Sequence, residues 1–404
     1  MRDLWTMYGE AAHTAAGFFW KSGWAFVLGY TISASIQAFV PKKRLTRHMG
    51  NAGVKSIGLA TTFGTISSSC SFAALAAARA LVSKGAHFVS AVAFMFASTN
   101  LVIELGILIL IFLGWQFLVA EVIGGLILIA ISAALIRLTY PKRWFDAARR
   151  KVEDEMRSDD EDFDWKARVK SLDGWSRVGE NFVGEWAMVW QEILIGFTLA
   201  GFIAVFVPVD FWETIFLSDL AEKNPANFWI VLENAAVAPF VAASTFIGSM
   251  GNIPLATILN SGGVLFGGLM GFIYSDLMVP PLVKVNAKYY GWRVALYIAA
   301  IMYVSILCTA LALHYGFYWT DLTPTSVRKV GDIAQFNIDY TFYMNIVALV
   351  LVAIMLWLRR WRRKHADEEA EGMEGSPIGV QDVVAWVFIA VLIGGGIAFA
   401  VTGG

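Results

Sequence analysis

The chain has 404 residues, of which 57% are hydrophobic and 16% are charged. A single water-soluble core cannot bury that much apolar surface, so the composition predicts a polytopic membrane protein. The formal net charge of −1 lacks the basic excess that is typical of nucleic-acid-binding proteins. The expected partners are therefore the lipid bilayer and a small molecule or ion, with no nucleic acid.

Eight apolar segments are candidates to cross the bilayer, whose hydrocarbon core needs about 20 residues per helix. In chain order they are 24–40, 87–113, 115–139, 187–209, 264–283, 292–316, 341–358 and 382–402. The expected fold class is an all-α polytopic membrane protein with about eight transmembrane helices.

Basic loops fix the topology of the first third of the chain. The loops at 42–55 and 142–151 are both rich in Lys and Arg, which favours the cytoplasm for each. An even number of crossings must separate two cytoplasmic loops, yet three apolar segments lie between them. One of these segments must therefore enter and leave the membrane on the same side.

Residues 55–84 form the segment that we expect to turn back, because a polar stretch from Ser67 to Ser71 divides it. Each piece of about 12 to 14 residues reaches only about 18 to 21 Å, which is too short to span. The sequence predicts a re-entrant helical hairpin with its tip at 67–71. Such backbone survives in a membrane only where it lines a cavity or is buried in protein.

The same pattern occurs a second time, because residues 84–116 align without gaps on 261–293. The matched positions include Gly85 with Gly262, Ser98 with Ser275, Gly114 with Gly291 and Trp115 with Trp292. Upstream, the small and polar stretch 248–252 breaks another apolar run, which predicts a second hairpin at 233–262. Basic residues place the corner at Gly291 in the cytoplasm and the corner at Gly114 outside, so we expect inverted repeats.

These features divide the chain into four expected parts. They are a first transmembrane repeat at 1–140 with hairpin 55–84, a charged cytoplasmic linker at 141–186, a second, inverted repeat at 187–317 with hairpin 233–262, and two additional transmembrane helices at 318–404. Inverted repeats with broken helices are the architecture of secondary transporters, whose substrates bind near the bilayer midplane at half-helix ends.

The segment SSCSFAALAAARALVSKGAHFVSAVAFMFASTN, with the later FLGWQ and GNIPLA, resembles the predicted-permease family that includes the bacterial organoarsenical efflux permeases. The resemblance covers roughly residues 24–317. In that family the first break reads Cys-Ser-Cys with a proline further on, whereas here Ser68 replaces the first cysteine and Ala74 stands at the proline. The resemblance implies a permease, and it implies efflux of a soft metalloid or organometalloid, which thiolate ligands select.

Candidate substrate-binding residues lie at the two breaks and in the span that follows the first. They are Ser68, Ser69, Cys70, Ser71, Asn100 and Asn252. The serines suit a hard or hydroxylated solute, and the thiol suits a soft one. The structural alternative for Cys70 is a small buried residue that contacts no solute. For Asn252, contact with the solute and a role in packing helices together are equally favoured.

Charged side chains inside spans are costly and by default mark a substrate or proton pathway. On this ground Glu104, Asp276, Glu192 and Arg79 are the candidates for coupling or charge compensation. The structural alternatives are a hydrogen-bond partner for the carboxylates and, for Arg79, an ion pair or a position that reaches the cytoplasmic surface. Glu121 is expected to extend to a membrane interface instead.

The sequence thus predicts a permease of a prokaryotic cytoplasmic membrane that moves a small solute by alternating access. One alternative is a channel formed by the paired hairpins. A less favoured one is an intramembrane enzyme using Cys70, because no histidine lies near the break to act as a base. No enzyme activity, cofactor or metal site is expected, since nucleotide motifs and metal-ligand spacings are absent from the sequence. A homo-oligomer is left open.

Overall fold

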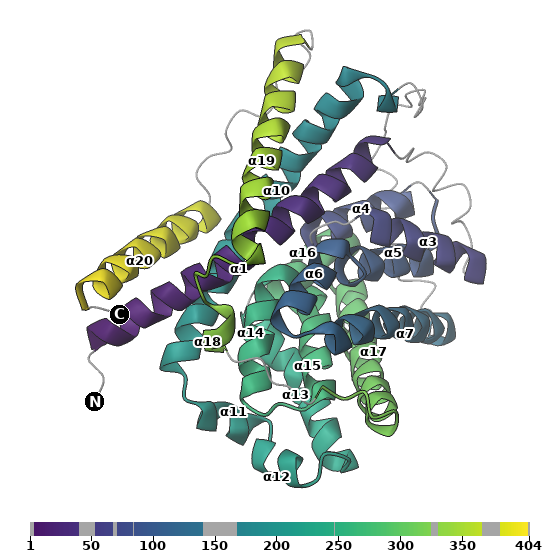
Figure 1. Ribbon diagram of the computed structural model, residues 1–404. Helices are drawn as coiled ribbons and strands as arrows, with labels where there is room; N and C mark the ends of the chain where they lie inside the picture. The colour runs from purple at the N-terminus through teal and green to yellow at the C-terminus, as the bar shows by residue number, and fades with distance from the viewer. Residues whose placement is uncertain are drawn as a thin grey trace. The chain divides into compact units, whose positions relative to one another are not determined.

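The computed structural model describes residues 4–39, 53–67, 71–83, 85–139, 168–245, 247–324, 330–365 and 380–402. Within these ranges all regular secondary structure is helical (Figure 1), which confirms the all-α fold class. Three candidate substrate ligands at the first break, Ser68, Ser69 and Cys70, lie outside the described residues.

The described helices confirm a polytopic membrane protein. Six of them are long and apolar enough to cross a membrane, and two bent helix pairs raise the number to eight if each pair is one span. One of the six is α13 (Phe228–Thr245), whose C-terminal part the sequence predicts as a hairpin arm. Helix α1 (Leu4–Phe39), which contains residues 24–39 of the expected span 24–40, is not among them. Its sequence mixes Thr, Ser and Gln among apolar residues, and this lowers its hydropathy.

Contacts between Cα atoms group the chain into two units. The first comprises Met1–Val40, Phe163–Pro208 and Lys329–Gly404, and the second comprises Pro41–Asp162 and Val209–Arg328. Each unit therefore takes residues from both expected repeats. The division along the sequence into repeats, linker and terminal helices stays a prediction.

In the first unit, α1 packs along α10 (Leu172–Phe206), and both contact α19 (Tyr340–His365) and α20 (Val380–Thr402) (Figure 1). Short α18 (Val330–Ile333) also lies against α1. Aromatic rings fill the α1–α10 interface, where Phe26 and Phe197 have ring centroids 5.8 Å apart. The interface also buries a polar contact, in which Ser33 donates to Glu185 Oε1 at 2.7 Å.

Two hydrogen bonds of Asn345 in α19 join this helix to the backbone of α1. Its Nδ2 donates to the Trp20 carbonyl at 2.8 Å, and its Oδ1 accepts from the Trp24 N–H at 3.1 Å. A hydrogen bond between membrane helices contributes about 0.6 kcal/mol on average and up to about 1.7 kcal/mol, and Asn345 makes two of them. Asn345→Leu is therefore expected to lower the free energy of unfolding by about 1–2 kcal/mol in a detergent thermal-unfolding assay. Asn337→Leu is the control, because Asn337 is exposed and its described hydrogen bond is the one that it donates to nearby Gln335.

The second unit contains two sets of five corresponding elements. The first set is α3 (Val54–Ser67), α4 (Ser71–Ser83), α5 (Phe88–Asn100), α6 (Ile103–Phe112) and α7 (Trp115–Thr139). The second set is α13, α14 (Ser249–Ser261), α15 (Phe266–Ile273) continued by η1 (Tyr274–Met278), α16 (Pro280–Tyr290) and α17 (Trp292–Trp319). Two short helices, α11 (Val209–Ile215) and α12 (Ser218–Lys223), precede the second set.

The two sets break at matching positions. The α5–α6 pair and the pair formed by α15–η1 and α16 are each bent by 42°. Their second helices begin at Ile103 and Pro280, which occupy the same place in the sequence alignment. The next corner follows the same pattern, since Gly114 and Gly291 both have positive φ, 110° and 87°, directly before a helix that starts with Trp. Glycine is the residue that adopts this backbone conformation without steric cost.

The contacts within and between the two sets are also matched. Helices α3 and α4 pack on α5, as α13 and α14 pack on α15. Between the sets, α4 contacts α16 and, reciprocally, α14 contacts α6. Two related bodies that contact each other through a two-fold relation produce reciprocal pairs of this kind. These crossings bring the starts of α4 and α14 close to the η1 turn.

Candidate functional site

The two segments that the sequence predicts as hairpins meet at one carboxylate, Asp276 of η1. Ser249, the first residue of α14, donates to Asp276 Oδ2 at 2.6 Å, and Ser71, the first residue of α4, donates to the same oxygen at 3.1 Å. The two hydroxyl oxygens are 3.4 Å apart. All three residues are buried. We call Ser71, Ser249 and Asp276 the serine–aspartate cluster.

Helix ends and burial both act on the Asp276 carboxyl group. The first N–H groups of a helix have no partner inside the helix and carry partial positive charge, so two helix starts beside a carboxylate stabilise its negative charge. The second oxygen, Oδ1, has no hydrogen-bond partner of standard geometry among the described residues. A buried polar atom left in this state costs free energy. A proton, or a donor group of a bound solute, would remove that cost.

The two serine hydroxyl groups are expected to contribute unequally to stability. A buried hydrogen bond to a charged group contributes about 1.5–3 kcal/mol, and the bond from Ser249 is the shorter one. Ser249→Ala should therefore lower the unfolding free energy in detergent more than Ser71→Ala does. Ser261→Ala at the far end of α14 is the control, since its hydroxyl donates to the Ile258 carbonyl. Equal losses for Ser249→Ala and Ser261→Ala would contradict the assignment.

Asn252, the candidate ligand in the second predicted hairpin, is fully buried one turn after Ser249. Its Nδ2 donates to the Ile247 carbonyl at 3.3 Å, and its Oδ1 accepts from the Thr245 hydroxyl at 3.3 Å. The amide thus connects the end of α13 to the start of α14. Contact between Asn252 and a solute stays a prediction.

Two polar side chains flank the break between α5 and α6. Asn100 ends α5, Glu104 lies in the first turn of α6, and both are buried. The Asn100 Nδ2 donates to the Phe96 carbonyl at 3.2 Å, whereas its Oδ1 has no partner among the described residues. Asp276 lies at the corresponding break of the second set, so each break carries an acidic residue.

The expectation that Glu121 of α7 extends to a membrane interface is wrong, because its side chain is buried in the protein and only 1% exposed. Hydropathy gives the depth of a residue in the membrane but not the face of the helix that carries it. Here the face is set by Tyr274, whose hydroxyl donates to the carbonyl groups of Ala120 and Glu121 at 3.0 and 3.1 Å. Neither Glu121 carboxyl oxygen has a partner of standard geometry in the described part of the chain.

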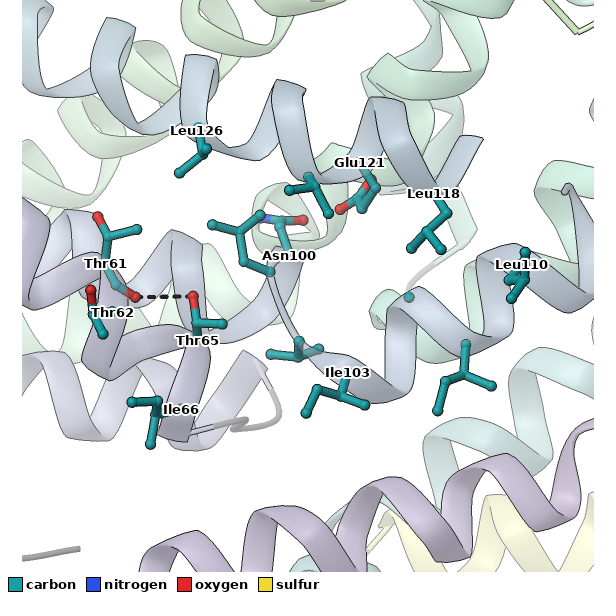
Figure 2. Close-up of a pocket in the computed structure, with 15 residues that line it drawn as sticks. Thr61, Thr62, Thr65, Ile66, Asn100, Ile103, Leu110, Leu118, Glu121 and Leu126 are labelled. Atoms are coloured by element: carbon teal, nitrogen blue, oxygen red, sulfur yellow. Dashed lines mark hydrogen bonds between the residues drawn. The ribbon is translucent and has the colours of Figure 1, made fainter. Parts of the chain in front are cut away.

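A cavity of about 600 Å³ lies between α3, the α5–α6 break and α7 (Figure 2). Its walls are mostly apolar, and they include Asn100 and Glu121. The residues that line it are Thr61, Thr62, Thr65, Ile66, Asn100, Leu101, Val102, Ile103, Gly106, Ile107, Leu110, Leu118, Glu121, Val122 and Leu126.

Arg79 and Glu192 are the remaining candidates. The guanidinium carbon of Arg79 lies 4.5 Å from the centroid of the Tyr289 ring, a cation–π contact at the α4–α16 crossing. Glu192 is a half-buried residue of α10, in the other unit. Of the sequence candidates, the structure joins Ser71 and Asp276 directly. Sequence reasoning missed Ser249, although a serine that starts the helix after each break was a usable signal.

Comparison with known proteins agrees with this architecture. Residues 7–315 match a family model described as "Predicted permease". A protein of Mycobacterium tuberculosis (strain ATCC 25618 / H37Rv), named "Putative permease Rv2963", is 36% identical over 329 residues, which cover 78% of this chain and 79% of that protein. No solved structure matches the chain significantly. The chain is a multi-pass membrane protein, and it belongs to the predicted-permease family that its sequence motifs resemble.

Proposed function

We propose that this permease moves a small solute across the cytoplasmic membrane by alternating access, with the serine–aspartate cluster as the place where solute and proton exchange. The observation that carries the proposal is a single buried carboxylate that accepts hydrogen bonds from the first residues of two interrupted helices, one from each set. A carboxylate that bridges both sets responds to any movement of one set against the other.

The reciprocal contacts support alternating access. Helix α4 contacts α16 and α14 contacts α6, so exchanging the two sets exchanges the contacts. In transporters built from inverted repeats, the two repeats adopt each other's conformation as the site opens first to one side and then to the other. The cluster connects α4, α14 and η1, and it is therefore suited to change its hydrogen bonds in such a transition.

Competition for one oxygen of Asp276 supplies a coupling mechanism. Ser71 and Ser249 both donate to Oδ2, whereas Oδ1 has no partner of standard geometry among the described residues. A proton or a hydroxyl donor of the solute would occupy Oδ1, and each would weaken the binding of the other by the same factor. Solute and proton would then bind in turn, so that protons moving inward drive the solute outward.

A soft metalloid or organometalloid is the solute class that we assign for efflux. Cys70 directly precedes Ser71 in the sequence, and thiolates select soft, thiophilic ions. Hydroxyl groups of a trivalent metalloid would provide the donors for the Asp276 Oδ1. The resemblance to organoarsenical efflux permeases points to the same class.

Accumulation of trivalent methylated arsenic in a sensitive host tests this function. Cells that express the intact protein should retain less arsenic than cells with an empty vector, and Cys70→Ser should remove the difference. Cys308→Ser is the matched control, because Cys308 is an exposed cysteine of α17 and should remain active. Equal accumulation with the intact protein and the empty vector would overturn the proposed solute.

A further inference from the structure

The cavity beside α7 differs in character from the serine–aspartate cluster. Its volume of about 600 Å³ falls in the range of about 300–1,000 Å³ that holds drug-sized molecules. The donors of its threonine hydroxyls are already used, because Thr61, Thr62 and Thr65 each donate to a carbonyl one turn earlier in α3. The cavity is therefore an apolar space with few groups that can bind a polar ligand.

Two buried polar groups remain available in this cavity. They are the Oδ1 of Asn100, which is 2% exposed, and the carboxyl group of Glu121, which is 1% exposed. Figure 2 shows both side chains in the space between α3, α6 and α7. Both groups accept hydrogen bonds. The Asn100 Oδ1 has no described partner, and the Glu121 carboxyl group, which lies beside the Tyr274 hydroxyl, has none of standard geometry, so both match a ligand that donates hydrogen bonds.

The buried acidic groups around the cavity favour a ligand with a positive charge. Glu121 interacts electrostatically with Asp276, a second buried acid. No described lysine or arginine forms an ion pair with either of them. Buried carboxyl groups without a cation favour a positively charged partner and repel an anion.

The apolar residues at the opening of the cavity favour a ligand with an apolar body. Side chains of Ile103, Leu110, Val122 and Leu126 line the cavity and are 45%, 40%, 49% and 51% exposed. These residues belong to α6 and α7, which are parts of candidate membrane spans. An apolar opening on such helices admits a lipophilic molecule far more readily than a hydrated ion.

We propose that this cavity binds a lipophilic organic monocation, with its ammonium group between Glu121 and the Asn100 Oδ1 and its apolar body against α3 and α6. An ammonium group has three donors and no acceptor, which fits the two acceptors of the cavity. None of the three residues of the serine–aspartate cluster lines this site, although Glu121 interacts electrostatically with Asp276.

Binding of 1-naphthylmethylamine to the full chain in lipid nanodiscs tests the charge preference. The neutral 1-naphthylmethanol and the anionic 1-naphthoate are the matched probes, and intrinsic naphthyl fluorescence is the readout. The amine should bind saturably above the level of empty nanodiscs, and 1-naphthoate should not. Glu121→Gln should weaken binding of the amine by at least about tenfold and binding of the alcohol by less than about threefold.

A steric pair of variants tests the location. Leu126→Trp fills the cavity and should abolish saturable binding of both the amine and the alcohol. Val119→Trp is the control on the same helix, because Val119 is exposed and does not line the cavity. Thermal unfolding would verify that each variant is folded. Amine binding that survives both Glu121→Gln and Leu126→Trp, or equally tight binding of 1-naphthoate, would overturn the proposal.

Discussion

Asp276→Asn is expected to reduce proton-coupled efflux by about 100-fold or more while the protein remains folded. Asparagine has the shape of aspartate, and its side-chain oxygen still accepts the hydrogen bonds from Ser71 and Ser249. It cannot bind and release a proton near neutral pH. The substitution therefore keeps the hydrogen bonds of the serine–aspartate cluster and removes its ability to bind a proton.

Two transport modes in proteoliposomes distinguish the consequences, with trivalent methylated arsenic as the solute. Uphill transport driven by a pH gradient should be lost in Asp276→Asn, whereas exchange of labelled for unlabelled solute should persist. The exposed Asp332 of α18 provides the control Asp332→Asn, which should behave like the unsubstituted protein. Uphill transport at the normal rate in Asp276→Asn would contradict the proton role. Conduction without exchange would indicate a channel.

Gly64→Ala is expected to lower the unfolding free energy by about 1–3 kcal/mol, the usual cost of overpacking a tight interface. A Cβ atom at Gly64 would overlap with the Phe94 carbonyl oxygen and lie 2.7 Å from the Ala97 Cβ, both in α5. Backbone atoms cannot yield as a flexible side chain does, so α3 must move away from α5. Because α3 ends at Ser67, this movement should also lower transport.

Gly58→Ala in the same helix is the matched control, since a Cβ atom at Gly58 meets nothing within 4 Å. Alanine favours helix more than glycine does, so this variant should be neutral or slightly more stable. Thermal unfolding in detergent and the amount of folded protein in the membrane are the two measurements. A loss in Gly64→Ala no larger than in Gly58→Ala would refute close packing between α3 and α5.

Local signals in the sequence predicted part of the fold well. The ungapped alignment of 84–116 on 261–293 anticipates where the structure repeats its features, because a positive-φ glycine and the helix start after it depend on nearby residues. The same alignment placed Asp276 in the counterpart of the span that carries Asn100 and Glu104. The polar interruption from Ser67 to Ser71 likewise marks the place where α3 ends and α4 begins.

The sequence did not predict which helices pack against each other. Membrane helices share similar apolar surfaces, so small residues and interhelical hydrogen bonds decide which faces meet. Hydropathy cannot reveal that α1 packs along α10, nor that Tyr274 holds the face of α7 that buries Glu121. Ser249 was missed for a related reason, because a run of small residues at 248–252 is typical of close helix packing.

Disulfide formation between Ser71→Cys and Ser249→Cys tests the meeting of the two interrupted helices most directly. The two hydroxyl oxygens are 3.4 Å apart, and a disulfide needs only a small further approach. In a background without Cys70 and Cys308, mild oxidation should link the two helices rapidly, as detected by mass spectrometry. The pair Ser71→Cys and Ser261→Cys, at the opposite end of α14, should stay reduced. Failure of the first pair to link, or equal linking of both pairs, would contradict a shared site at Asp276.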